Sequence, residues 1–293
     1  MRAINWARAH LPAGIGATML GVVGAIGQHV DARAQSEQVA IPDFSSAGKM
    51  WVLMNGTAYF RAPGDTGPGP IVDMPGHEYI ADYNNRVADT TNPILKPWAK
   101  KLMDINNQRV LAGGIPFYTT SRCWPGGVPG LLLFPGEPVV FIQTPNEVWI
   151  MSQRDAQVRR VYLNVPHSRN PKYSVYGESV GHYENGDTLV VDTIGLNDSV
   201  PIDRFRTPHT NQLHVVERYR LTNGGKNIEI VFTVEDPGAF NMSWKAKVDF
   251  ERGYGARSGG PWVESICADG PHDYFADQKS GAVPIPEAET SDF

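Results

Sequence analysis

The sequence lacks most of the patterns that mark cofactor-dependent and nucleic-acid-binding proteins. It carries a formal net charge of −5 and has no stripe of basic residues, so nucleic-acid binding has little support. It has no glycine-rich loop of the Rossmann or Walker type, which argues against dinucleotide and nucleotide cofactors. It also has no His-x-His or His-Glu-x-x-His pattern. We therefore expect a protein that uses no cofactor and no metal.

Cysteine is scarce, because Cys123 and Cys267 are the two in the chain. Neither has a Cys-x-x-Cys partner or an adjacent histidine, which disfavours a metal site built on them. In an oxidising compartment such a pair suggests one disulfide, worth about 4 kcal/mol on the chain-entropy model. Two buried free thiols are the alternative.

Residues 1–34 have the pattern of a cleavable secretory signal peptide. Arg2 and Arg8 form a basic start, residues 11–27 are uncharged and apolar, and residues 32–34 (Ala-Arg-Ala) form a small-x-small cleavage site. The apolar run is short and rich in Gly and Ala for a membrane-spanning helix, so an uncleaved anchor is the weaker alternative. No later apolar stretch is long enough to span a membrane. We predict a periplasmic or secreted protein.

The rest of the chain predicts one domain. Residues 35–47 are polar and suggest a linker, 48–277 form a single β-rich domain, and 278–293 suggest a disordered acidic tail. The content of 30 Gly and 23 Pro suits a turn-rich β protein. One N-terminal helix is expected near 92–109, because three apolar residues recur at helical spacing. They are Trp98, Leu102 and Ile105.

From Val139 onward, short runs rich in β-branched and aromatic residues follow one another with turn signals between them. Such sequential hairpins favour a mainly β fold, a single antiparallel meander that closes as a lipocalin-like barrel. A β-sandwich is the alternative. The predicted strands are 139–143, 147–151, 158–164, 187–194, 213–221, 227–235 and 244–250.

Two carboxylates lie on apolar strand faces, where burial is costly unless they are paired. Glu217 lies in the middle of such a face and Asp236 ends another. Glu217 either bonds Arg160 or Tyr162 inside the barrel and only fixes the packing, or points into a ligand cavity with a tuned pKa. Asp236 either caps a turn or contacts a ligand.

His167, His182 and His209 lie at predicted strand ends or in loops. In a meander several such loops meet at one rim, where an open barrel binds ligands. Three converging histidines could hold a metal, but no ligand motif supports this. His209 and His214 are five residues apart, which places them on opposite faces of a strand.

The segment 177–181 (GESVG) has the outline of a nucleophile elbow. Its surroundings indicate a loop before a strand, whereas an elbow needs a strand, a sharp turn and a helix. We therefore expect no nucleophilic serine there.

Several segments together resemble a large family of exported bacterial proteins, most of which carry no assigned activity. The strongest is GESVGHYENGDTLVVDTIGLND at 177–198. The resemblance implies one β-rich, lipocalin-like domain with both cysteines at family positions, and it implies no reaction. Family members usually have Arg-Trp where this chain has His182-Tyr183, which makes His182 a candidate for a substrate-specific change. The other matching segments are CWPGGVP at 123–129, QTPNEVWI at 143–150, RRVYLN at 159–164, HTNQLHVVERYRL at 209–221, TVEDPGAF at 233–240 and ESICADG at 264–270.

These features together favour an enzyme that performs acid–base chemistry without a cofactor. Elimination, hydration, isomerisation or hydrolysis of a small apolar or aromatic substrate would suit an exported barrel with buried carboxylates. The expected catalytic residues are His182 or His209 as base, Asp192 or Glu217 as orienting group or acid, Arg160 as anion holder, and Tyr183 or Tyr162 as a proton donor. The residues expected to contact the substrate are His167, Tyr162, Trp244 and Asp236.

Two other functions remain open at this point. The 7 Trp, 11 Tyr and 11 Phe residues suit a non-catalytic, lipocalin-like carrier of a hydrophobic ligand equally well. A structural protein of the cell envelope is the third possibility, and it predicts no stabilisation by any ligand.

Overall fold

The computed structural model describes nine stretches of the chain, all in the compact unit Val39–Phe293. The predicted signal peptide, most of the linker, the acidic tail and Cys267 lie outside the described residues, so the predictions for them, including the disulfide, stay predictions. The described residues are 41–45, 50–54, 60–64, 68–78, 86–114, 119, 123–133, 137–253 and 262.

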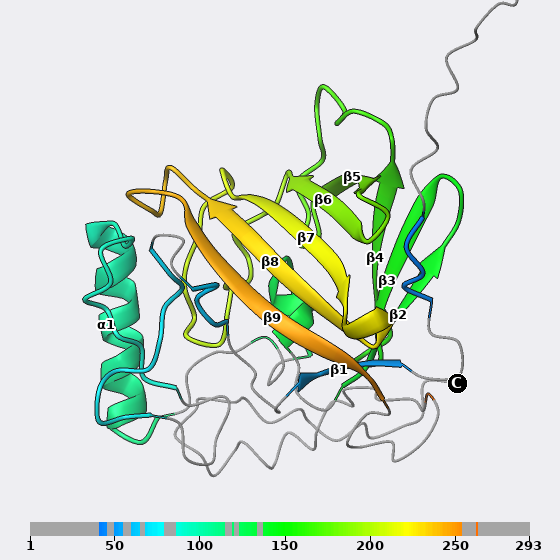
Figure 1. The fold of residues 1–293 in the computed structure, drawn as a ribbon. Helices are drawn as coiled ribbons and strands as arrows, with labels where there is room; N and C mark the ends of the chain where they lie inside the picture. Colours follow the sequence, from blue (N-terminus) through cyan, green and yellow to red (C-terminus); the bar gives the residue numbers. More distant parts are fainter. Residues whose placement is uncertain are drawn as a thin grey trace, which may run out of the picture. The chain divides into compact units, whose positions relative to one another are not determined.

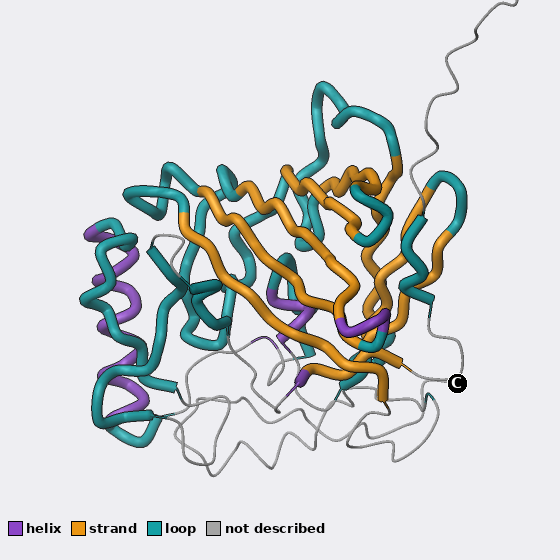
Figure 2. The backbone as a smooth tube through the Cα atoms, viewed as in Figure 1, coloured by secondary structure: helices purple, strands orange, loops and turns teal. Residues whose placement is uncertain are grey.

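Within these described stretches, nine β-strands close into a single barrel (Figures 1 and 2). The barrel predicted from the sequence is confirmed, rather than the sandwich. The strands are β1 (Met50–Leu53), β2 (Val139–Gln143), β3 (Glu147–Ser152), β4 (Gln157–Leu163), β5 (Glu178–Glu184), β6 (Thr188–Ile194), β7 (His214–Thr222), β8 (Asn227–Glu235) and β9 (Trp244–Gly253).

The strands follow one another around the barrel in sequence order, and β1 completes the circle between β9 and β2. Every neighbouring pair is antiparallel except β4 and β5, which run parallel. A parallel pair needs a connection that returns to the starting end of the strand. Here that connection is the loop 164–177, and the alternation of the sequence did not indicate it.

All seven strands predicted from the sequence are present, and their observed bounds differ from the predicted ones by a few residues at most. β1 and β5 were missed. β5 contains Ser179 and Gly181 of the GESVG segment and ends in the polar residues His182–Glu184. Its alternation of apolar residues is therefore too weak to indicate a strand. Between β5 and β6, residues 185–187 form the turn, because Glu184 pairs with Thr188. Asn185 and Gly186 have φ of 54° and 73°, in the left-handed region that Asn and Gly adopt most readily.

The interior of the barrel is filled by alternate side chains of the strands. On β7 and β8 the buried faces are those that the alternation predicted, and the aromatic ring of Tyr219 packs edge-on against Phe141. The largest fully buried side chains in the described strands are Trp51, Trp244, Arg159, Tyr219 and Phe232.

The helix α1 (Pro97–Leu111) lies outside the barrel (Figure 2), and it is the α-helix that the sequence placed at 92–109. The three apolar residues that predicted it face solvent, with exposed fractions of 42 %, 42 % and 52 % for Trp98, Leu102 and Ile105. The buried face instead carries Ala99, Met103 and Asn107. Within the described residues, no helix is long and apolar enough to cross a membrane.

Candidate functional site

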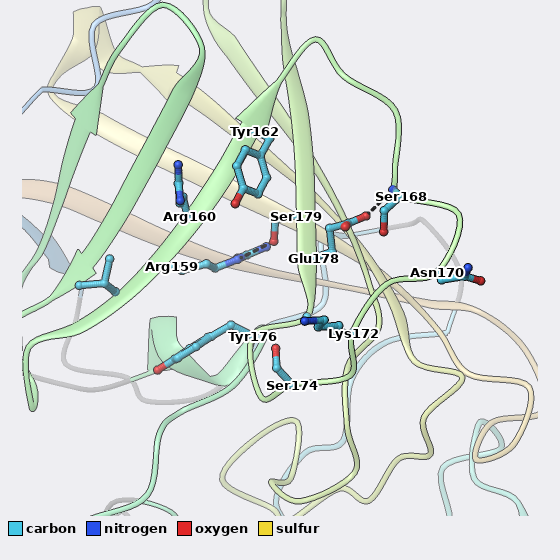
Figure 3. A pocket seen from close by; sticks show the side chains of 12 residues that line it. Arg159, Arg160, Tyr162, Ser168, Asn170, Lys172, Ser174, Tyr176, Glu178 and Ser179 are labelled. Atoms are coloured by element: carbon cyan, nitrogen blue, oxygen red, sulfur yellow. Dashed lines mark hydrogen bonds between the residues drawn. The ribbon is translucent and has the colours of Figure 1, made fainter.

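The parallel pairing of β4 and β5 creates the cleft shown in Figure 3. The two strands pair only where 161–163 meets 179–181, so the first half of β4 faces the returning loop 164–177 instead of a strand. The space between them has a volume of about 530 Å³. It is lined by Val158, Arg159, Arg160, Tyr162, Ser168, Asn170, Lys172, Ser174, Tyr176, Gly177, Glu178 and Ser179.

The inner side of the cleft is formed by a buried polar network around Arg159. The Arg159 guanidinium donates from Nε to Ser179 Oγ (3.1 Å) and from Nη2 to Thr193 Oγ1 (2.7 Å). It also forms an ion pair with Glu217, whose other carboxylate oxygen accepts the hydroxyl of Tyr219 at 3.0 Å. Arg159 and Glu217 are 2 % and 0 % exposed, so this charge pair lies within the barrel.

The electrostatics of this network keep Arg159 charged and Tyr219 neutral. Burial acts to lower the pKa of Arg159, but the nearby Glu217 carboxylate outweighs burial and the pKa is raised. Burial and the same carboxylate raise the pKa of Tyr219 well above its ordinary value. Tyr219 therefore stays protonated, and its hydroxyl donates a hydrogen bond to Glu217.

The expected partner of Glu217 was wrong. The alternation along the strands suggested Arg160 or Tyr162 as its partner, but these two side chains lie on the outer face of β4, and the inner face carries Arg159. Glu217 is fully buried and does not line the cleft, as expected for a residue that fixes the packing. Through Arg159 it nevertheless supports one side of the cleft.

Arg160 and Tyr162 both line the cleft from the outer face of β4. Arg160 binds Glu147 through two hydrogen bonds, Nε to Oε2 (3.0 Å) and Nη2 to Oε1 (2.5 Å). Its guanidinium carbon also lies 4.9 Å from the ring centre of Tyr162 and 5.3 Å from that of Trp149. These contacts hold the cation in place at the edge of the cleft.

Across the cleft, Glu178 at the start of β5 is held by the returning loop. Its Oε1 contacts His167 Nδ1 at 3.1 Å and accepts the backbone N–H of Ser168 at 2.7 Å. Oε2 has no hydrogen-bond partner among the described residues. Burial opposes the charge on Glu178, but the hydrogen bonds from Ser168 and His167 outweigh it and lower the pKa of Glu178.

From Glu178, a chain of contacts between histidines and carboxylates continues across the outer face of the barrel. His167 Nε2 contacts Asp192 Oδ1 on β6 at 3.1 Å, and the same oxygen contacts His214 Nε2 on β7 at 2.9 Å. His214 Nδ1 lies 3.5 Å from Glu235 Oε2 on β8. The hydrogen bond to Asp192 raises the pKa of His214, and the hydrogen bond from His214 lowers the pKa of Asp192.

The expected meeting of three histidines does not occur. His167 lies beside the cleft, but His182 is exposed on the outside of β5, where it binds Glu184 Oε1 at 2.8 Å. His209 is buried, and its ring nitrogens contact the carbonyl oxygens of Thr210 (2.9 Å) and Val200 (2.8 Å). Both of its nitrogens are therefore used by the backbone, and His209 is not placed to serve as a base.

Three further candidates lie apart from the cleft. Trp244 is buried in the core, and the hydroxyl of Tyr183 accepts a hydrogen bond from Gln143 Nε2 at 2.9 Å. Asp236 caps a turn, because Oδ1 accepts the backbone N–H of Gly238 at 2.8 Å. It also borders a second cavity, of about 570 Å³.

Several residues of the site were not predicted from the sequence, among them Arg159, Lys172, Glu178, Ser179 and His214. Arg159 had a signal, because it alternates with Val161 and Leu163 on one face of β4. Ser179 of GESVG lies inside strand β5, with its hydroxyl bonded to Arg159 and Thr193. The expectation of a loop there was wrong, and the serine is not on an elbow.

Neither the models of known protein families nor the curated proteins gave a match to this chain. In the part of the chain that the structure describes, no three His, Cys, Asp or Glu side chains are arranged to hold a metal ion.

Proposed function

We propose that the protein is an exported enzyme that performs acid–base chemistry without a cofactor in the cleft between β4 and β5. The observation that carries the proposal is the carboxylate of Glu178. One oxygen is fixed by His167 and the backbone of Ser168, while the other has no partner among the described residues, on a side chain that lines the cleft. An oriented carboxylate with one unoccupied oxygen can accept a proton from a bound substrate.

The opposite wall supplies complementary groups. The hydroxyl of Tyr162 can donate a proton, and the cations Arg160 and Lys172 can bind an anionic group of the substrate. Arg159 and Ser179 form the inner side. The expected roles of Arg160 as anion holder and Tyr162 as proton donor thus suit this cleft, while Glu178 takes the place of the histidine base.

The lining favours a polar substrate over the apolar or aromatic one that the sequence suggested. Most of the lining side chains carry a hydroxyl, an amide or a charge. We therefore propose elimination, hydration, isomerisation or hydrolysis of a small hydroxylated or anionic compound. The alternative is a non-catalytic carrier, which the closed barrel also suits.

The test compares two outward-facing glutamates of β5. Purified protein, Glu178→Gln and Glu184→Gln are incubated with a panel of hydroxy acids and sugar acids, and conversion is followed by NMR. Glu184 binds Arg218 and His182 and does not line the cleft, so it is a matched control. Removing the base should lower turnover by a factor of about 100 or more in Glu178→Gln and leave Glu184→Gln unchanged.

The outcomes separate the two functions. Equal conversion by both variants would remove Glu178 as the base. A compound that binds tightly in the cleft and is recovered unchanged would indicate the carrier.

A further inference from the structure

The loop 164–177 forms one wall of the cleft and is attached to the barrel at a few points. Its second half is bound through the backbone, since the N–H of Ser174 donates to Gly195 O at 3.0 Å and the N–H of Asn197 donates to Ser174 O at 2.9 Å. Its first residue is also bound through the backbone, since the N–H of Asn164 donates to Gly181 O at 2.8 Å. Between these points the loop is bound through His167 and the N–H of Ser168, and so through side chains that can change their charge.

The contacts of His167 are complete only when its ring is protonated. Both ring nitrogens lie 3.1 Å from a carboxylate oxygen, Glu178 on β5 and Asp192 on β6. A carboxylate oxygen can only accept, so both hydrogen bonds require an N–H on each nitrogen, which is the imidazolium form.

The same arrangement is repeated one strand further on. His214 on β7 lies between Asp192 and Glu235 of β8, at 2.9 and 3.5 Å. Asp192 Oδ1 thus contacts both imidazoles. Among the described residues, Glu178, Asp192 and Glu235 are the charged groups that face the two rings.

We infer that His167 and His214 form a protonation-dependent clasp that positions Glu178 and holds the wall 164–177 against the barrel. His167 binds the loop to the Asp192 carboxylate on β6, and His214 holds that carboxylate in place. Both are positioning residues, since neither lines the cleft itself. The clasp itself is argued from these contacts alone. Only its role in catalysis, the positioning of Glu178 as a base, rests on the proposed function.

The direction of the pH dependence follows from the charges. When the rings lose their protons, each keeps one N–H, and its other nitrogen presents a lone pair to a carboxylate. Three carboxylates then lie near one another, and among the described residues none of them forms an ion pair with a lysine or an arginine. The wall is therefore bound while the two rings are protonated and loosened when they are neutral.

Amide hydrogen exchange tests the clasp without a substrate. The N–H of Ser168 reports directly, because it donates to the Glu178 oxygen that His167 also contacts. The N–H of Ser174, bonded to Gly195, is the internal control in the same loop. Exchange is measured at about pH 5.5 and about pH 8.5, on either side of the ordinary histidine pKa of about 6.5, and corrected for the intrinsic rate.

In the unmodified protein, the protection of the Ser168 amide should fall about fivefold at the higher pH. This is the ratio expected when a partly exposed, charged hydrogen bond is lost. The protection of the Ser174 amide should stay constant. His167→Gln should give low protection at both values, and His214→Gln an intermediate value at the lower pH. His182→Gln, an exposed histidine on β5 outside the clasp, should behave as the unmodified protein.

Protection of Ser168 that does not change with pH, or the same change in His167→Gln, would overturn the clasp. Failure of the catalytic proposal is seen separately, as full conversion by Glu178→Gln. Each result can thus occur without the other.

Discussion

At the scale of single residues, the most consequential feature is the charge pair buried in the barrel. Arg159 and Glu217 form an ion pair there, and each side chain bonds further partners. Arg159 bonds Ser179 and Thr193 besides Glu217, and Glu217 also accepts from Tyr219. A buried pair of this kind adds little net stability, but loss of one partner leaves an uncompensated charge.

We therefore predict that Glu217→Ala lowers the free energy of unfolding by about 3–5 kcal/mol. Urea denaturation measures the change, with Glu184→Ala as the matched control because Glu184 forms an ion pair on the exposed face of β5. The control should cost about 1 kcal/mol or less. Equal effects of the two substitutions would contradict the buried pair.

At the scale of elements, the parallel crossover between β4 and β5 decides where the cleft lies. The loop must turn into β5 at Gly177, which has φ of +60°. A Cβ atom at this position would lie 2.3 Å from the carbonyl oxygen of Ile194. The turn thus needs glycine for its backbone angle and also for the close approach to β6.

Gly177→Ala should cost about 3 kcal/mol, since the left-handed backbone adds about 1–2 kcal/mol and the clash with β6 adds more. Gly224→Ala is the control for the backbone angle alone, because Gly224 has φ of +61° and no atom within 4 Å of an added Cβ. It should cost about 1 kcal/mol. Urea titrations of both variants give the comparison, and similar costs would show that the contact with Ile194 O is relaxed.

The helix α1 offers a second prediction at this scale. Met103 is fully buried beside the barrel, whereas Leu102, the next residue back, is 42 % exposed. Met103→Ala should therefore lower the free energy of unfolding by about 2–5 kcal/mol, and Leu102→Ala by about 0.5 kcal/mol. Thermal or urea unfolding of the two variants checks the orientation of the helix, which the reverse order would contradict.

At the scale of the whole molecule, the charged outer face gives stability a defined dependence on pH. The pKa of His214 is raised from its ordinary 6.5, so its contribution is complete below that value and is lost as the pH rises through the raised pKa. The pKa values of Asp192 and Glu229 are lowered from 3.8 and 4.5 by hydrogen bonds from His214 and Arg220. Their contributions are present above those ordinary values and are lost as the pH falls through the lowered ones.

The melting temperature should consequently be highest between about pH 4.5 and pH 6.5 and fall on both sides. His214→Gln should flatten the decline on the alkaline side, by about 2 °C for a partly exposed pair in a domain of this size. On the acid side it should remove the part that Asp192 contributes, because His214 lowers the pKa of that carboxyl, and leave the part that comes from Glu229. His182→Gln should leave both sides unchanged. A series of thermal melts across pH provides the test.

The candidate site shows how far local patterns reach. The alternation of apolar and polar residues placed Glu217 on the inner face of β7 correctly, because side-chain direction in a strand depends only on parity along the chain. Its partner could not be found in this way. Parity assigned Arg160 and Tyr162 to one face of β4, but which face turns inward depends on the neighbours that cover it.

The amino-acid sequence was sufficient for the β-rich class, seven of the strands and the approximate place of α1, because periodicity and turn residues act locally. It favoured a closed barrel but left a sandwich as the alternative, and the pairing of the strands decided between them. The tertiary structure decided the parallel pairing of β4 and β5, the inward side of Arg159, and the meeting of Glu178, His167 and Asp192. Each of these is set by contacts between segments distant in the chain. No single stretch of residues contains that information.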